Sequence, residues 1–185
     1  MTPWQKYQQD LQREDFVYDA AQENAVRHLQ RLFDDLTAQK PAARGWFSKL
    51  FNKNSTAPIK GLYFWGGVGR GKTYLVDTFY EALPGTRKMR VHFHRFMHRV
   101  HEELKKLDKT ANPLEVVADI FKAETDIICF DEFFVQDITD AMLLGGLMEA
   151  LFARGIVLVA TSNIIPDELY RNGLQRARFL PAIAL

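Results

Sequence analysis

Apolar residues along the chain follow two patterns, one typical of buried strands and the other typical of helices. Short continuous apolar runs occupy 61–65, 127–130 and 155–160. Elsewhere, apolar residues recur every three or four positions, most clearly over 20–36, 74–83, 113–121 and 137–152. A continuous apolar run is typical of a strand buried on both faces, and strands that alternate with helices predict an α/β fold.

The segment that begins at residue 88 predicts a half-buried strand and then a basic helix. Apolar and polar residues alternate over 88–94, and apolar positions at helical spacing continue to Leu104. His94, His98 and His101 would share one face of this helix. Three roles stay open for that face: a solvated basic surface, a contact with nucleic acid or an acidic partner, and a metal site, for which no complete ligand set lies nearby in the sequence.

The stretch 66–73 matches the phosphate-binding loop of nucleotide-binding proteins. It reads Gly66, Gly67, Val68, Gly69, Arg70, Gly71, Lys72 and Thr73. A predicted strand precedes it and a predicted helix follows, so its glycines would direct backbone N–H groups at a polyphosphate beside the positive end of the helix. We predict that Lys72 contacts the β- and γ-phosphates of ATP and that the Thr73 hydroxyl is a ligand of Mg²⁺.

Polar residues at two strand ends complete the predicted site. Asp131 and Glu132 follow the apolar run 127–130, and a parallel strand delivers its last residues to the crevice where ligands bind. We predict that Asp131 holds Mg²⁺, directly or through water, and that Glu132 polarises the attacking water as general base. Asn163 follows the run 155–160 and is predicted either to hydrogen-bond the γ-phosphate or the water, or to form a turn before Pro166.

The N-terminal residues 1–40 predict a helical segment that packs on the core. Asp19 is placed to cap the helix over 20–36. Phe16 and Tyr18 precede that helix, and we expect them to pack on the domain, with stacking on a purine ring as the alternative.

The rest of the chain divides into an insertion and a core. Residues 41–58 are rich in Pro, Gly, Ser and Asn and predict a loop or insertion, whereas 59–185 form the nucleotide-binding core. Within 44–53, the apolar residues Trp46, Phe47, Leu50 and Phe51 are set among basic residues. They fit either a loop whose aromatic side chains tuck onto the domain or a surface for a partner or an anionic membrane.

Composition narrows the class of protein. The 185 residues are 47% hydrophobic and 25% charged with a net charge of +1, so no global attraction to nucleic acid is expected. The single cysteine, Cys129, excludes an internal disulfide and lies in an apolar run, which favours a buried thiol in a reducing compartment. Since no stretch matches a signal peptide or a bilayer span, we expect a cytoplasmic location.

Together these residues resemble the ZapE family of AAA+ ATPases, bacterial cell-division proteins with mitochondrial relatives. The resemblance covers nearly the whole chain and rests on 66–73, 130–133, 161–163 and 174–181, with the histidine-rich strand and helix. It implies a phosphate-loop NTPase fold of AAA+ type, with a parallel five-stranded sheet flanked by helices. The strand that ends at Asn163 would lie between the phosphate-loop strand and the acidic strand, and the helical lid domain of AAA+ proteins would be missing.

The resemblance also implies residue roles and partners. Asn163 would sense the γ-phosphate, and Arg178, or as second choice Arg176, would reach the nucleotide of an adjacent subunit in a homo-oligomer. The expected function is Mg²⁺-dependent ATP hydrolysis that destabilises polymers of the tubulin-like division protein FtsZ.

Other functions stay open at the level of sequence. An ATP-controlled nucleic-acid loader would use the basic stretch 87–109. A small-molecule kinase would transfer the phosphoryl group to an acceptor other than water, but the adjacent Asp131 and Glu132 favour water. A GTPase is disfavoured because the chain has no Asn-Lys-x-Asp sequence.

Overall fold

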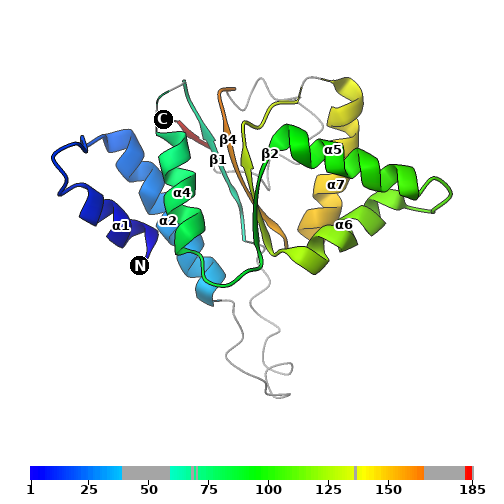
Figure 1. Ribbon diagram of the computed structural model, residues 1–185, viewed down its shortest axis with the longest axis horizontal. Coiled ribbons are helices and arrows are strands. Elements are labelled where there is room, and N and C mark those ends of the chain that lie inside the picture. The colour runs from blue at the N-terminus through cyan, green and yellow to red at the C-terminus, as the bar shows by residue number, and fades with distance from the viewer. Residues whose placement is uncertain (39–58, 68, 70, 136, 165–181, 185) are drawn as a thin grey trace, which may run out of the picture.

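A parallel sheet between two layers of helices forms the framework of the molecule (Figure 1). The computed structural model describes residues 1–38, 59–67, 69, 71–135, 137–164 and 182–184. The strands are β1 (Leu62–Trp65), β2 (Lys88–His92), β3 (Ile127–Asp131), β4 (Val157–Ser162) and β5 (Ala182–Ala184). All their pairings are parallel, which confirms the predicted α/β class with a parallel sheet flanked by helices.

The strands are arranged in the order β2-β3-β4-β1-β5. Strands β1 to β4 contain four to six residues each and form the body of the sheet, whereas β5 has three residues and pairs with β1 at the edge. Strand β4 lies between β1 and β3, where the resemblance placed it. The residues that follow these three strands therefore meet at one edge of the sheet.

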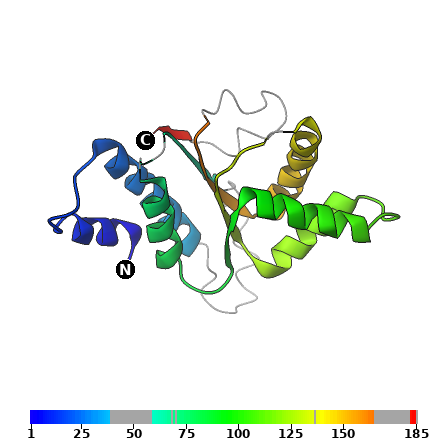
Figure 2. The same ribbon diagram turned by 45° about the horizontal axis from the view of Figure 1, so that its top comes forward.

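Among the described residues, three helices lie on each face of the sheet. One layer contains α1 (Pro3–Asp10), α2 (Ala20–Ala38) and α4 (Lys72–Ala82). The other contains α5 (Phe93–Lys106), α6 (Pro113–Glu124) and α7 (Ile138–Ala153). The view in Figure 2 keeps the two layers on opposite sides of the strands.

The buried strands divide their side chains between two apolar clusters. Ile128, Phe130 and Leu158 pack with residues of the α5–α6–α7 layer, whereas Cys129 and Val159 pack with residues of α2 and α4. Alternate residues of a strand point to opposite faces, so runs that are apolar throughout fill both clusters. Burial raises the pKa of the Cys129 thiol to about 12, which keeps it neutral, as expected for a packing residue.

The N-terminal helices pack against α4, the helix that follows the phosphate loop. Asp10, only 1% exposed, accepts a hydrogen bond at 2.7 Å from the Tyr74 hydroxyl of α4. The ring of Phe16 contacts the Tyr74 ring with centroids 5.2 Å apart, as the packing interpretation predicted. The same expectation was wrong for Tyr18, which is 57% exposed because its hydroxyl donates to Glu23 at 2.6 Å on the surface. Asp19 caps α2, since its carboxylate accepts from the backbone N–H of Ala21 at 2.8 Å.

One predicted boundary was wrong. Strand β2 ends at His92, whereas the alternation predicted a strand through His94. Helix α5 begins at Phe93, and both Phe93 and Phe96 are buried. Residues three apart lie on the same face of a helix, so the packing of these two aromatic side chains overrides the strand-like alternation of Phe93 and His94.

Among the described helices, none has the length and apolarity that a membrane span requires.

Gly61 allows β1 to approach β4 closely. A Cβ built at this position would lie 1.8 Å from the carbonyl oxygen of Leu158. We expect Gly61→Ala to lower the free energy of unfolding by at least about 2 kcal/mol, because backbone atoms of a central strand must shift. Chemical denaturation measures the change. Gly67→Ala is the control, because a Cβ there meets no atom of the described residues within 4 Å. Equal stability of the two variants would contradict the expectation.

Candidate nucleotide site

The site lies where β1, β3 and β4 end together. Gly66 follows β1, Asp131 ends β3 and Asn163 follows β4. The backbone N–H of Gly66 donates to the Ser162 carbonyl at 3.2 Å, which fixes the start of the phosphate loop to β4. The same polar edge includes a bond of 2.7 Å from the Ser162 hydroxyl to the carbonyl of Phe133.

The phosphate loop has the backbone geometry that only glycine adopts readily. Gly69 and Gly71 have φ angles of 82° and 79°, in the left-handed region. A Cβ at Gly71 would also lie 2.8 Å from the Gln22 amide nitrogen, but this flexible side chain can move aside, so the positive φ is the main reason for glycine there. Gly71 begins α4 without a side-chain cap, which leaves the positive end of the helix to a ligand. Val68 and Arg70, which the sequence also assigned to this loop, lie outside the described residues.

Lys72 joins the loop to β4. Its ammonium group donates to the carbonyls of Gly66 and Gly67 at 2.6 and 2.8 Å and to Asn163 Oδ1 at 2.9 Å. Burial lowers the pKa of Lys72, because removing an ammonium group from water disfavours its charged form. The two residues that the sequence assigned to the γ-phosphate, Lys72 and Asn163, are therefore in direct contact.

Asp131 is engaged by an arginine that the sequence did not single out. Arg90 on β2 donates from Nε to Asp131 Oδ2 at 2.8 Å and from Nη2 to Oδ1 at 3.2 Å. Its Nη1 also donates to Asp77 on α4. Hydrogen bonds to Asp131 and Asp77 raise the pKa of Arg90, so the guanidinium stays charged. Nothing in the sequence distinguished Arg90 from the other basic residues around this strand.

The other two predicted catalytic and metal-binding side chains face solvent. Glu132 has a φ angle of 53°, an unusual backbone conformation for this residue type, and its side chain is 80% exposed. Its carboxylate lies 3.9 Å from Nδ1 of His92. Thr73, in the first turn of α4, is also exposed. Both side chains are therefore accessible to a ligand.

The residues of this site fit a nucleoside triphosphate with Mg²⁺. Of the described residues, none has an atom within 4 Å of a Cβ built at Gly67 or Gly69, which leaves room for phosphate oxygens, and Lys72 supplies the positive charge. Thr73 and Asp131 offer hydroxyl and carboxylate oxygens, the ligands that Mg²⁺ prefers. Each carboxylate oxygen has two lone pairs, so the contact of Asp131 with Arg90 leaves acceptor capacity.

Several hypotheses drawn from the sequence concern residues outside this site. Arg176, Arg178 and the surface proposed over 44–53 lie outside the described residues. Within the described chain no group of three potential metal ligands forms, so the histidine face on α5 gains no support as a metal site. His101 is instead 2.8 Å from Asp140 on α7.

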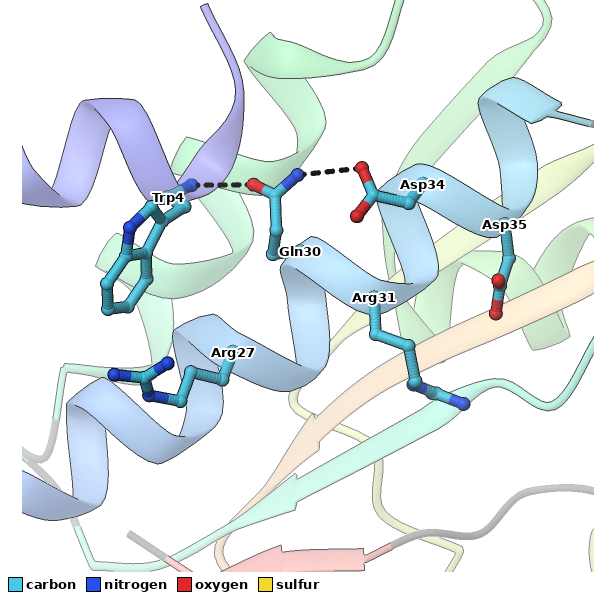
Figure 3. A pocket seen from close by; sticks show the side chains of 6 residues that line it. All are labelled: Trp4, Arg27, Gln30, Arg31, Asp34 and Asp35. Carbon is cyan, nitrogen blue, oxygen red and sulfur yellow. Dashed lines mark hydrogen bonds between the residues drawn. The ribbon is translucent and has the colours of Figure 1, made fainter.

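A separate hollow of about 460 Å³ lies between α1 and α2 (Figure 3). Arg27 lies 4.4 Å above the ring of Trp4, and Gln30 accepts from the Trp4 backbone N–H at 2.9 Å. None of the lining residues belongs to the predicted nucleotide site. The hollow is lined by Trp4, Arg27, Gln30, Arg31, Asp34 and Asp35.

The fold of the chain is shared with a known nucleotide-binding protein. The AMPPCP-bound DnaA from Aquifex aeolicus has a TM-score of 0.61 and 18% sequence identity, and the match covers 93% of this chain and 49% of that chain. At this identity the likeness shows the fold alone.

Sequence comparison goes further than the fold. The family model described as AFG1-like ATPase matches residues 1–185. The cell division protein ZapE of Escherichia coli K12 is 59% identical over 192 residues, which cover 99% of this chain and 51% of that protein. Lactation elevated protein 1 homolog B of Danio rerio is 48% identical over 139 residues, 69% of this chain and 28% of that protein. The chain thus spans about half the length of the bacterial relative, and it belongs to the AFG1-like ATPase family.

Proposed function

We propose that the chain binds ATP with Mg²⁺ and forms the hydrolytic core of an AAA+ ATPase. The observation that supports this most directly is the hydrogen bond of 2.9 Å between Lys72 and Asn163. It brings two residues 91 positions apart to the mouth of one glycine-rich loop. A positive charge and an amide at this place can bind the γ-phosphate, the group that hydrolysis removes.

Each side chain of the site has a distinct task in this proposal. The loop N–H groups and Lys72 bind the phosphates, and Thr73 with Asp131 holds the metal. Mg²⁺, when bound, neutralises phosphate charge and orients the β- and γ-phosphates. Asn163 holds the γ-phosphate or the attacking water in place. Glu132 accepts a proton from that water, and its exposed carboxylate has the freedom to approach it.

Arginine from a neighbouring subunit would complete the site. Arg178, with Arg176 as second choice, would stabilise the charge that develops on the transferred phosphoryl group, and supply in trans would couple hydrolysis to assembly of a homo-oligomer. From the similarity to ZapE we extend the proposal to bacterial cell division, with FtsZ polymers as the partner that the ATPase destabilises.

The test combines binding with turnover. Titration with a fluorescent ATP analogue measures ATP binding to this chain, and phosphate release measures ATP hydrolysis by the full-length protein. We expect Mg²⁺ to raise both the affinity and the rate of hydrolysis. FtsZ polymers should stimulate hydrolysis, and ATP should shorten those polymers in a sedimentation assay. No binding of the analogue to the wild-type chain would overturn the proposal.

Single-stranded DNA added in place of FtsZ tests the loader alternative. Three of the cations on the basic helix α5 already have partners: Lys105 and Lys106 each pair with a glutamate of the same helix, and Arg99 pairs with Glu124. Salt-sensitive DNA binding that is lost when Arg95 and Arg99 are reversed in charge would favour the loader.

A further inference from the structure

Arg90 connects three elements of the site through ion pairs. It belongs to β2, contacts Asp131 at the end of β3 through two hydrogen bonds of 2.8 and 3.2 Å, and contacts Asp77 of α4 through a third. The side chains of Arg90 and Asp131 are 23% and 17% exposed. A two-point arginine–carboxylate contact that is largely shielded from water fixes the orientation of the carboxylate plane.

The register of the sheet explains why Arg90 reaches Asp131. Arg90 pairs with Cys129 across the β2–β3 ladder. Side chains two residues apart on a strand share a face, so Arg90, Cys129 and Asp131 all lie on the face that α4 covers. The guanidinium extends along this face to the carboxyl end of β3 and meets Asp77 from the helix above.

We propose that Arg90 is a positioning residue that holds the Asp131 carboxylate in the orientation that Mg²⁺ requires, so that the metal strengthens nucleotide binding. This inference rests on the proposed function, in which Asp131 is a metal ligand. It assigns Arg90 no contact with the nucleotide.

The charges of the network suit this role. Arg90 alone would repel a divalent cation, but Asp77 supplies a second negative charge, so that Arg90, Asp131 and Asp77 together carry a net negative charge. Removal of the groups that orient a metal ligand typically lowers metal affinity about 10–100-fold. Loss of Arg90 should therefore weaken the Mg²⁺ effect, although it removes a positive charge from the site.

A purely structural tie between β2 and α4 is the competing explanation. That connection already exists at the other end of the strand, where Lys88 Nζ donates to the carbonyls of Tyr80 and Leu83 at 2.7 and 3.0 Å. A structural role for Arg90 predicts a change in stability with no change in the response to Mg²⁺. The positioning role predicts the change in that response.

The experiment measures the dissociation constant of a fluorescent ATP analogue with EDTA and with saturating Mg²⁺, using the full chain. The ratio of the two constants is the Mg²⁺ enhancement. Arg90→Ala should bind the analogue in EDTA as the wild type does, while its Mg²⁺ enhancement falls about tenfold. Arg90→Lys keeps the charge but loses the two-point contact, so it should recover only a minor part of the loss.

Arg87→Ala is the matched control. Arg87 forms a similar two-point contact with Asp126, at 2.9 and 3.1 Å, at the opposite end of β2. Its loss should leave the Mg²⁺ enhancement unchanged. Circular dichroism checks that each variant is folded. If Arg90→Ala is not folded, the Mg²⁺ enhancement of Arg90→Lys decides the test.

The outcomes separate the two proposals. An Mg²⁺ enhancement in Arg90→Ala and Arg90→Lys that equals the wild-type value would overturn the positioning role, and a larger one would show that Arg90 competes with the metal. Either result leaves ATP binding itself intact. Failure of the wild-type chain to bind the analogue would instead overturn the proposed function.

Discussion

Replacing Lys72 with alanine is expected to weaken ATP binding about 100-fold or more. The ammonium group is the one side-chain cation at the mouth of the described loop, and a hydrogen bond to a charged group contributes about 1.5–3 kcal/mol. Two such contacts with the β- and γ-phosphates account for a loss of this size, since about 1.4 kcal/mol corresponds to a tenfold change. Titration with a fluorescent ATP analogue measures it.

The same substitution should affect folding only slightly. Lys72 donates to two loop carbonyls and to Asn163, and two of these three contacts are exposed, so water can replace the lysine. Lys60→Ala is the control, because Lys60 is exposed and precedes β1 at the end away from the loop. Wild-type affinity in a folded Lys72→Ala variant would remove Lys72 from the phosphate site.

The central strands could be predicted because a continuous apolar run indicates a strand that is buried on both faces. Each of β3 and β4 packs into two clusters, so every position is apolar until the strand reaches the site. The end of β2 could not be predicted in the same way. At its boundary with α5, His92, Phe93 and His94 fit a strand alternation and a helix start equally, and only the packing of Phe93 in the core decides between them.

The phosphate loop could be predicted because its chemistry is local in sequence. Left-handed φ angles at Gly69 and Gly71 need glycine, and Lys72 follows them directly. The contact of Lys72 with Asn163 depended in addition on strand order, since residues at the ends of neighbouring parallel strands meet.

The Arg90 network could not be predicted because none of its three residues is close to another in sequence. Arg90 is 41 positions from Asp131 and 13 from Asp77. Their meeting depends on the pairing of β2 with β3 and on the placement of α4 over that face. Sequence alone presented Arg90 as one of several basic residues around the strand, with no signal that distinguished it from Arg87.

Replacing Glu132 with glutamine is expected to preserve ATP binding and reduce hydrolysis in the full-length protein about 100-fold or more. Glutamine has nearly the same shape but cannot accept a proton from water, and a positioned general base typically contributes about 10²–10⁴-fold. Glu132 takes no part in the loop, and its side chain is 80% exposed, so the substitution leaves the phosphate contacts of Lys72 in place. Phosphate release under single-turnover conditions measures the chemical step apart from product release.

The matched control for this variant is Glu149→Gln, which neutralises an exposed glutamate on α7, away from the strand ends. It should hydrolyse ATP as the wild type does. Glu132 also has a left-handed φ of 53°, a conformation that costs about 1–3 kcal/mol and is concentrated at functional sites. Glutamine keeps any such strain, so a loss of turnover at unchanged stability isolates the carboxylate. Equal hydrolysis by Glu132→Gln and the wild type would exclude Glu132 as the general base.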